Sequence, residues 1–520
     1  MHMLSNQAKN SAHRKAKATI IANNHWSIGS IVLVLKYKLY ISGEWVDSES
    51  GETFSRVNPA NPDEVIGEFQ KGDENDVRKA VDAAEDALEK WSETPPPKRA
   101  EFVFKAGQLM KENKEELSRT MTHEMGKILI ESRADVQEAI DVAYYAGGEG
   151  RRLLGHTTTS ELRDKFAMTV RLPIGVAGLI TPWNFPIAIP ARKILYALIC
   201  GNTIVFKPAS DTPLCAVKLV EILEKAGVPR GVVNLVTGPG ESVGNSIVKN
   251  EKVHVISFTG HKDTGAIILR EAGIKRVRLE LGGKNPIIIM DDADLKLALD
   301  GVIWGGYGTT GQRCTATSRV IIQEKVKPIF EKMLVEKIGK LKLGDGLDPA
   351  TDVGPLVNKA AQDKTNRYCQ IGEKEGARLL VGGKIPDMKG WFFEPTLFTD
   401  CTADMRIAKE EIFGPVVCLI SAKNFDNAIE IANSVEYGLV SSIYTGSIRN
   451  AFVAIKKLET GLTYVNSSTI GSEAHLPFGG VKHSGNMREG GPEGIEEFTE
   501  LKTVYFDYSG KLQKAQIDIE

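Results

Sequence analysis

The 520-residue sequence lacks three features, each of which would by itself indicate a class of protein. These are a block of like charge, a CxxC pair and an apolar run of about 20 residues, the length that spans a bilayer. Lys and Arg total 65 and Asp and Glu total 67, so the formal net charge is −2 and a surface for nucleic acid is not expected. The six cysteines are scattered, with no His at ligand spacing, which argues against a zinc site and a disulfide framework. This usage is typical of a reducing compartment, and we expect a cytoplasmic protein with no membrane partner and no metal site.

Residues 1–37 differ from the rest of the chain. A polar, basic stretch (2–17) is followed by a short apolar run (28–35), an arrangement that also fits a signal peptide. Lys36 and Lys38 follow the apolar run, where a cleavage site would have small residues. We therefore expect residues 1–37 to form a poorly ordered or loosely attached extension.

The remaining sequence has the composition of a folded protein with several domains. Hydrophobic residues make up 42% and charged residues 25% of the chain, and the length is typical of about three domains. Alternation around a Ser-Gly pair predicts a hairpin at 39–46, and helical spacing predicts the helices that follow. These segments carry no visible chemistry, and we interpret them as scaffold. A turn cluster lies at 58–62, and the helices are expected at 73–91, 99–113, 115–126 and 132–147.

Between residues 172 and 286 short apolar or β-branched runs alternate with helical patterns. Such alternation predicts a parallel sheet with helices on both faces, the doubly wound α/β architecture. Sheets of this kind bind ligands beyond the carboxyl ends of their strands, so the loops there are the candidates for a site. The strands are expected at 174–180, 203–206, 232–236, 254–258 and 276–280, and the helices at 188–198, 215–226, 242–248 and 264–272.

Cys314 lies on a glycine-rich stretch at 308–315 that reads Gly-Thr-Thr-Gly-Gln-Arg-Cys-Thr. A cysteine on such a turn has an accessible sulfur and free backbone N–H groups around it. A nucleophile needs the first, and the negative charge that it creates on a substrate needs the second. Most free cysteines are nevertheless small buried hydrophobes, and on this stretch alone that interpretation is favoured.

Two polar residues follow predicted strands of the sheet. Asn184 lies between two prolines and is flanked by Trp183 and Phe185. Its amide is suited to donate to an oxyanion, although capping of the next helix is an equal alternative. Lys207 directly follows a central strand, where it would hold ribose hydroxyls or a phosphate; a solvated surface lysine is the alternative.

Glu280 ends another predicted strand, beside Gly282 and Gly283, which leave room for water or substrate. A buried carboxyl with a raised pKa is a common general base near neutral pH. The alternative is a carboxylate paired with Lys284. Glycine loops also follow two strands, but none matches the GxGxxG dinucleotide fingerprint, so they are weak signals of a phosphate site.

Asn184, Lys207, Glu280 and Cys314 follow one another along the chain, each within a distinctive string, and together they resemble the aldehyde dehydrogenase superfamily. The resemblance runs from about Leu39 to about Tyr508. It implies an α/β fold with a Rossmann-type doubly wound cofactor domain, an α/β catalytic domain and a small β oligomerisation element. The supporting strings are Glu-Glu-Ile-Phe-Gly-Pro at 410–415, Pro-Phe-Gly-Gly-Val-Lys at 477–482 and Arg-Glu-Gly at 488–490. The implied domains are 38–154 with 172–283 for the cofactor, 284–499 for catalysis, and 155–171 with 500–520 for oligomerisation.

The resemblance implies an enzyme that oxidises an aldehyde to a carboxylic acid with NAD or NADP. Cys314 would attack the aldehyde, and the resulting oxyanion would lie between the Asn184 amide and the Cys314 backbone N–H. After hydride transfer a thioester would remain, and Glu280 would activate the water that hydrolyses it. A CoA-acylating dehydrogenase is a less favoured alternative, because such relatives lack the glutamate. A non-enzymatic member of the superfamily is another, although it would be free to lose both Cys314 and Glu280.

For the cofactor, the resemblance places Lys207 on the adenosine ribose, Glu411 on the nicotinamide-side ribose and Phe413 against the nicotinamide end. Relatives specific for NAD often have Glu where this chain has Ser210. A carboxylate there would repel a 2′-phosphate, so we expect NADP to be accepted and preferred over NAD. His261, where the family more often has Ser, has no assigned effect. The remaining expected cofactor residues are Trp183, Gly240, Gly244, Gly260 and Leu281.

Substrate choice is less determined by these patterns. Phe185 and Arg192 are expected in the substrate tunnel, because relatives acting on acid semialdehydes such as succinate semialdehyde have Arg at the position of Arg192. Such relatives often add a second Arg at the position of Gly308, so half of this clamp is missing. A semialdehyde and a broader aliphatic or hydroxy-aldehyde range therefore both stay open, and a loop at 467–475 is expected at the tunnel mouth.

The segment 155–171 alternates in a way that predicts two strands leaving the body of the domain. The aromatic, β-rich tail at 503–508 is expected to pair with this hairpin. Because an exposed hairpin edge is a liability, we expect another subunit to cover it, in a homodimer or homotetramer.

Overall fold

The computed structural model describes residues 34–517, so the prediction for residues 1–33 lies outside the described chain. The prediction of a loose extension is wrong for its last residues, since β1 (Lys36–Tyr37) pairs in parallel with β5 (Asn61–Gln70). The Tyr37 ring also stacks on Phe69, with ring centroids 4.9 Å apart. A two-residue strand held by a partner 32 positions away leaves no periodic signal in the sequence.

The first large sheet has seven strands in the order β12-β11-β8-β9-β10-β2-β3. Strands β12 to β10 are parallel, while β2 and β3 form the predicted antiparallel hairpin at one edge. This confirms the alternating pattern seen in the sequence. The strands are β2 (Leu39–Ile41), β3 (Glu44–Val46), β8 (Val176–Ile180), β9 (Thr203–Lys207), β10 (Val233–Leu235), β11 (Val255–Thr259) and β12 (Arg276–Glu280).

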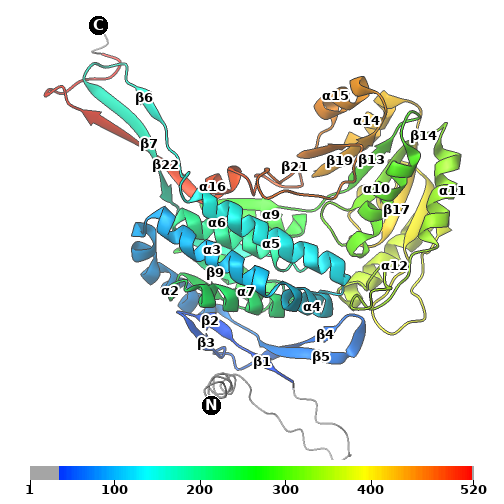
Figure 1. Cartoon of the computed structure of the whole chain (residues 1–520), viewed down its shortest axis with the longest axis horizontal. Helices are drawn as coiled ribbons and strands as arrows, with labels where there is room; N and C mark the ends of the chain where they lie inside the picture. The colour runs from blue at the N-terminus through cyan, green and yellow to red at the C-terminus, as the bar shows by residue number, and fades with distance from the viewer. Residues whose placement is uncertain (1–33, 518–520) are drawn as a thin grey trace, which may run out of the picture.

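Helices cover both faces of this sheet, as the doubly wound prediction requires (Figure 1). Alternate residues of β9 show the division: Ile204 and Phe206 pack into one buried core, and Val205 packs into the other. The first core joins the sheet to α3 (Pro96–Glu112), α4 (Lys114–Met125), α5 (Leu129–Glu149), α6 (Ala188–Cys200) and α7 (Pro213–Ala226). The second core joins it to α2 (Glu74–Glu93), η2 (Gly240–Gly244), α8 (Asn245–Lys249) and α9 (Lys262–Glu271).

The register of the parallel strands places their carboxyl ends at one edge of the sheet. Ile180 is opposite Lys207 and next to Phe258, and Thr259 is opposite Glu280. The loops that carry the candidate residues therefore begin side by side, although the strands are far apart in sequence. This edge faces the second large sheet (Figure 1).

The second large sheet has the order β15-β16-β17-β14-β13-β19-β20. The chain passes from the first sheet to the second between Glu280 and Asn285, and the nucleophile stretch follows the first helix of the second body. Its strands are β13 (Asn285–Ile289), β14 (Thr317–Gln323), β15 (Arg378–Val381), β16 (Thr396–Cys401), β17 (Val416–Ala422), β19 (Val440–Tyr444) and β20 (Leu462–Val465). Its helices are α10 (Leu295–Tyr307), η3 (Gly308–Gly311), α11 (Lys327–Ile338), α12 (Lys359–Lys374), α13 (Arg406–Lys409), α14 (Phe425–Asn433) and α15 (Ile448–Lys457).

After β18 (Tyr437–Gly438) and β21 (Val481–Lys482), which pair with each other, the chain returns to the first body. The short helix α16 (Glu493–Glu497) follows, and Ile495 and Phe498 are buried in the first core beside α6. The predicted catalytic segment 284–499 therefore does not stay on one body, because these apolar side chains bury their surface against the helices of the first body.

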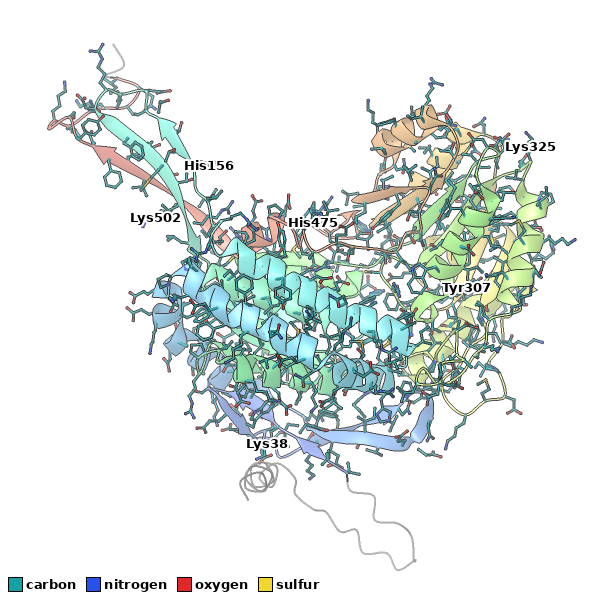
Figure 2. The ribbon with its side chains drawn as sticks, in the orientation of Figure 1. Lys38, His156, Tyr307, Lys325, His475 and Lys502 are labelled. Carbon is teal, nitrogen blue, oxygen red and sulfur yellow. The ribbon has the colours of Figure 1, made fainter. Side chains whose placement is uncertain are left out.

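A three-stranded antiparallel arm projects from the first body (Figure 1). It consists of β6 (Thr157–Thr159), β7 (Lys165–Pro173) and β22 (Thr499–Asp507), and the labelled His156 and Lys502 lie along it (Figure 2). All nine residues of β22 pair with β7, which confirms the predicted pairing of the tail with the hairpin. The remaining N-terminal strand, β4 (Thr53–Asn58), pairs with β5 below the helices. Between residues 34 and 517, no helix combines the length and apolar content needed to cross a membrane.

Candidate active site

A strained turn presents Cys314. After α10 ends, Thr309, Thr310 and Gly311 all have positive φ, at 51°, 58° and 69°. Two β-branched residues in the left-handed region are costly, so neighbouring contacts must hold them there. The Thr309 N–H donates to the Glu131 carboxylate at 2.7 Å, and the Thr310 hydroxyl donates to the Gly354 carbonyl at 2.9 Å. The segment predicted as scaffold thus supplies Glu131, a residue that the sequence patterns did not single out.

Cys314 differs from the other five cysteines, all of which lie in the described chain. They are buried, whereas Cys314 is partly exposed and lines a cleft together with Asn184. The alternative that Cys314 is a fully buried hydrophobe is therefore wrong. Burial of most of its surface, followed by the nearby carboxylates of Glu280 and Glu411, raises the pKa of the Cys314 thiol. The resting sulfur is protonated at neutral pH, so an attack on a carbonyl requires a proton acceptor.

Asn184 is held in place by the loop that carries Cys314. Its side-chain Nδ2 donates one hydrogen bond to the Gln312 carbonyl at 3.1 Å, two residues before Cys314, and its Oδ1 has no partner among the described residues. The amide carries two N–H hydrogens, so one is left for a ligand. The alternative of a helix cap is wrong, since α6 has no side-chain cap and the Ala188 N–H is bound by Asp135 instead.

Glu280 is 1% exposed, and neither of its carboxylate oxygens has a hydrogen-bond partner among the described residues. Lys284 is equally buried, and its Nζ is likewise without a described partner, so the alternative of a Glu280–Lys284 pair is wrong. Burial, followed by the charge of Glu489, raises the pKa of Glu280 well above its usual value. A carboxyl in this state can take up and release a proton near neutral pH.

A buried ionic network stands behind Glu280. Glu489 accepts from Lys193 at 3.0 Å and from Arg192 at 3.2 Å, and all three side chains are at most 6% exposed. These two cations outweigh the desolvation of Glu489 and hold the pKa of its carboxyl below the usual range. Lys193 also donates to the Ser257 hydroxyl at 2.8 Å. The motif around Glu489 was visible in the sequence, but Lys193 gave no signal beyond its place on a helix.

The same network changes the interpretation of Arg192. Its second terminal nitrogen contacts Glu138, so carboxylates of the protein already occupy both ends of the guanidinium, which also lies 5.3 Å from the Phe478 ring centroid. A substrate carboxylate would have to displace Glu138 or Glu489. The prediction of Arg192 as a free carboxylate clamp therefore does not fit its surroundings. The Phe185 ring centroid lies 5.4 Å from the guanidinium of Arg313, the residue before Cys314.

The cleft at Cys314 continues along the carboxyl edge of the first sheet. Five residues expected at a dinucleotide line it, and His261 lines it as well. The Trp183 and Phe413 rings meet edge to face, with centroids 5.4 Å apart, and Phe413 adopts a positive φ of 60°. The five residues are Trp183, Gly260, Leu281, Glu411 and Phe413.

Glu411 is fixed at the floor of this cleft. One oxygen accepts the Gly283 N–H at 2.9 Å, and a Cβ at Gly282 would lie 2.3 Å from the carboxylate. Only glycine at that position leaves Glu411 room to reach the cleft. An acceptor with a free lone pair beside an aromatic pair suits a ribose hydroxyl next to a flat ring, so these residues fit the nicotinamide half of a dinucleotide.

The residues expected at the adenosine half do not line the cleft at Cys314. Lys207 is 6% exposed and donates to the Pro208 carbonyl at 2.9 Å, while burial lowers its pKa to about 8. Ser210 donates to the Gly238 carbonyl at 2.9 Å and so joins the loop after β9 to the loop after β10.

Gly240 and Gly244 begin and end the π-helical turn η2, and a Cβ at either would meet open space. His261 caps α9 by accepting the Asp263 N–H at 3.3 Å.

Within residues 34–517 no group of His, Cys, Asp and Glu side chains is arranged to hold a metal ion.

The sequence and the fold of this chain were compared with those of known proteins. The model of the aldehyde dehydrogenase family matches residues 45–504. The chain is 44% identical to the alpha-ketoglutarate semialdehyde dehydrogenase of Haloferax volcanii, over 91% of this chain and 99% of the relative. It is 40% identical to the alpha-ketoglutaric semialdehyde dehydrogenase of Bacillus subtilis, over 90% and 98%. Among solved structures, betaine aldehyde dehydrogenase of Staphylococcus aureus in complex with NAD+ matches with a TM-score of 0.90 and 38% identity, over 92% and 96%.

Proposed function

The chain belongs to the aldehyde dehydrogenase family, and from this premise we propose which of its residues carry the reaction. Enzymes of this family oxidise an aldehyde to the carboxylic acid with NAD(P), and this chain is such an enzyme. One arrangement supports this assignment of residues. Cys314 and Asn184 line the same cleft. The buried Glu280 carboxyl has no partner among the described residues and is close enough to raise the pKa of the Cys314 thiol.

Cys314 is the nucleophile. Its sulfur attacks the aldehyde carbon and gives a thiohemiacetal, whose oxyanion accepts hydrogen bonds from the Asn184 Nδ2 and the Cys314 backbone N–H. Asn184 is already fixed by its bond to the Gln312 carbonyl, so it needs no reorganisation when the charge develops. One such donor typically contributes about 3 kcal/mol to the transition state. The protonated thiol gives up its proton before or during this attack.

Glu280 is the general base. Both of its oxygens lack partners, so the carboxylate can accept a proton from the Cys314 thiol or from a water molecule. When bound, the nicotinamide ring supplies the hydride acceptor that turns the thiohemiacetal into a thioester. Glu280 releases any proton taken from the thiol to solvent and then takes a proton from the water that attacks the thioester carbon. As the carbon–sulfur bond breaks, that proton passes to the Cys314 sulfur and the acid is released.

For the cofactor we infer that NADP is preferred over NAD. Ser210 replaces a carboxylate that would repel a 2′-phosphate, and Lys207 lies close by. The neighbouring Asp211 forms an ion pair with Arg56 at 3.1 Å and accepts a hydrogen bond from the Asn358 amide at 3.0 Å. A pKa near 8 leaves Lys207 ready to become fully protonated beside an added phosphate. Glu411 and Phe413 hold the nicotinamide end.

For the substrate we infer a short aldehyde that carries a carboxylate at its far end, of the kind that 2-oxoglutarate semialdehyde represents. The names of the Haloferax volcanii and Bacillus subtilis relatives point to this compound. A broad range of uncharged aldehydes is the competing possibility.

The experiment that tests the function is an aldehyde panel followed by cofactor reduction. The panel contains 2-oxoglutarate semialdehyde, succinate semialdehyde, glyceraldehyde and pentanal, each with NADP and NAD, with and without CoA. We expect turnover without CoA and the highest kcat/KM for a semialdehyde. A strict requirement for CoA would contradict the role of Glu280, and equal kcat/KM across the panel would contradict the substrate class.

We also infer a homodimer or homotetramer assembled through the arm. Several large apolar side chains of the arm are exposed in the single chain, including Phe166 at 43%, Tyr505 at 66% and Phe506 at 54%. Exposed patches of this kind mark interaction sites. The six thiols, none of them in a disulfide, suit a reducing compartment and a cytoplasmic location.

A further inference from the structure

One face of α5 contacts two loops of the active site. Glu131 and Asp135 are four residues apart, so they lie on the same side of the helix, about 6 Å apart along its axis. They are 3% and 1% exposed. One carboxylate oxygen of Glu131 accepts the Thr309 N–H at 2.7 Å, and one of Asp135 accepts the Ala188 N–H at 2.8 Å. A single helix thus contacts the turn before the nucleophile and the start of the helix that follows the oxyanion donor.

Asp135 fixes the loop of Asn184 to the first body. α6 begins at Ala188 without a side-chain cap of its own, so Asp135 supplies an acceptor for one of the N–H groups that a helix leaves unpaired at its start. Lys127 pairs with this carboxylate at 2.9 Å, with both side chains 0% exposed, and the Lys127 Nζ lies 4.0 Å from the Phe185 ring centroid. The pair is fixed in place, because each buried charge depends on the other for compensation.

The two donors proposed for the oxyanion come from different bodies of the molecule. Asn184 follows β8 of the first sheet, whereas Cys314 follows α10 of the second body. Neither body alone fixes the distance between them. α5 packs into the core of the first body, and its first residue, Leu129, donates to the Gly346 carbonyl of the second body at 2.9 Å. The contact of Glu131 with the turn before Cys314 is therefore a link across the boundary.

This turn depends on Glu131 for its shape and position. Thr309 has a φ of 51° and is 2% exposed, so its N–H is buried in a strained turn and needs an acceptor. The oxygen of Glu131 that accepts this N–H also lies 3.4 Å from the Arg313 Nη2. The Arg313 guanidinium lies 4.9 Å from the Trp304 ring centroid and 5.4 Å from that of Phe185. Glu131 therefore contacts both ends of the segment that leads to the nucleophile.

We propose that Glu131 is a positioning residue of the oxyanion hole, which holds the turn of Cys314 at the distance from Asn184 that lets both donors reach one oxygen. This inference rests on the roles proposed for Cys314 and Asn184 and names the residue that aligns them. The sulfur and the backbone N–H of Cys314 belong to one residue, so a shift of the turn leaves them together and separates them only from the Asn184 amide. A misplacement of about 1 Å typically slows a reaction about 100-fold.

The first test compares Glu131→Gln with Glu131→Asp. Gln keeps the length of the side chain and an oxygen that can accept the Thr309 N–H, whereas Asp keeps the charge but is one methylene group too short to reach. The rate of NADPH formation in the first turnover is measured per titrated active site, with the best aldehyde of the panel at saturation. We expect this rate to stay within about threefold of wild type for Glu131→Gln and to fall about 10- to 100-fold for Glu131→Asp. The reverse ranking would show that charge matters instead of position, and would overturn the proposal.

Two controls separate alignment from other effects of the substitutions. Asp141 is an exposed residue of α5, and Asp141→Asn should leave the first-turnover rate unchanged. A loss as large as that of Glu131→Asp would mean that any change in this helix slows the reaction, and would overturn the proposal. The Kd of NADPH, measured by fluorescence titration, should match wild type in Glu131→Asp. A matching loss of NADPH affinity would place the effect at the cofactor instead, and would likewise overturn it.

A double-mutant cycle with Asn184→Ala gives the second test. If Glu131 aligns the two donors, its replacement has little left to disturb once the amide is gone, so Glu131→Asp should cost about threefold or less in the Asn184→Ala background. Equal losses in both backgrounds would show a general effect on the fold or on Cys314, and would overturn the proposal. Glu131→Ala, which has no acceptor, repeats the cycle and keeps the test decisive if Glu131→Asp is unstable.

Asn184→Ala by itself separates this inference from the function on which it rests. Undiminished turnover in that variant refutes the proposed oxyanion role itself. A slow Asn184→Ala without any coupling to position 131 refutes only the positioning role of Glu131.

Discussion

Replacement of Glu489 by Gln would test how the buried network controls Glu280, the proposed general base. The substitution removes a negative charge that raises the pKa of Glu280, while Lys193 and Arg192 remain as cations. We therefore expect the pKa of Glu280 to fall toward its usual range.

The sign of the effect follows from the reaction. Hydrolysis needs the ionised carboxylate, so the rate falls as the pH drops through the raised pKa of Glu280. In Glu489→Gln the acid limb of the kcat profile should move to lower pH. Lys193→Met removes a charge of the opposite sign, one that lowers the pKa of Glu280, and should move the limb to higher pH. Glu489→Asp keeps the charge and should leave the limb in place, whatever it does to stability.

The assay is a set of kcat profiles under conditions where thioester hydrolysis limits turnover, accompanied by thermal melting of each variant. Breaking a buried ion pair typically costs about 3–5 kcal/mol, so a lower melting temperature is expected for Glu489→Gln and for Lys193→Met. The reasoning would be refuted if Glu489→Gln and Lys193→Met moved the acid limb in the same direction, or if Glu489→Gln left it unmoved. A purely structural role predicts lower rates at every pH without any shift.

Cys314→Ala should abolish dehydrogenase turnover while cofactor binding, measured by fluorescence titration with NADPH, persists; undiminished turnover would refute the nucleophile. Ser210→Glu should lower the NADP/NAD ratio of kcat/KM by about 10-fold or more, because a carboxylate would then face the 2′-phosphate; an unchanged ratio would show that Ser210 is not the discriminator. Replacing Tyr505 and Phe506 together by Ser should shift the mass found by light scattering toward that of a single chain, and an unchanged mass would show that these side chains lie outside the subunit interface.

The local elements of this protein were predictable because their signals are short-ranged. Helical spacing predicted α2, and the structure adds that Asp73 caps it by accepting two N–H groups of its first turn. Alternating β-branched runs gave the parallel strands of the first sheet within one or two residues. The exceptions, such as β1 and the π-helical turn η2, are held by contacts or geometry that have no period in the sequence.

The candidate site was predictable to the extent that its residues stand in distinctive strings. Cys314, Asn184 and Glu280 were all identified in this way, and the register of the sheet explains why their loops meet. Arg192 was identified too, but its role depends on a partner 297 residues away in sequence. Arg313 stood in a motif without a role, since the carboxylate that contacts it lies 182 residues earlier.

The sequence by itself therefore determined the architecture, the chemistry and the three residues proposed to carry it, because each leaves a pattern within a few neighbouring positions. Only the tertiary structure decided the electrostatics around them. It pairs Arg192 with Glu138 and Glu489, leaves Glu280 unpaired, and sets Arg313 between two rings. These outcomes depend on which charges are buried together when distant helices and loops pack, and burial rather than residue identity decides what a charged side chain is free to bind.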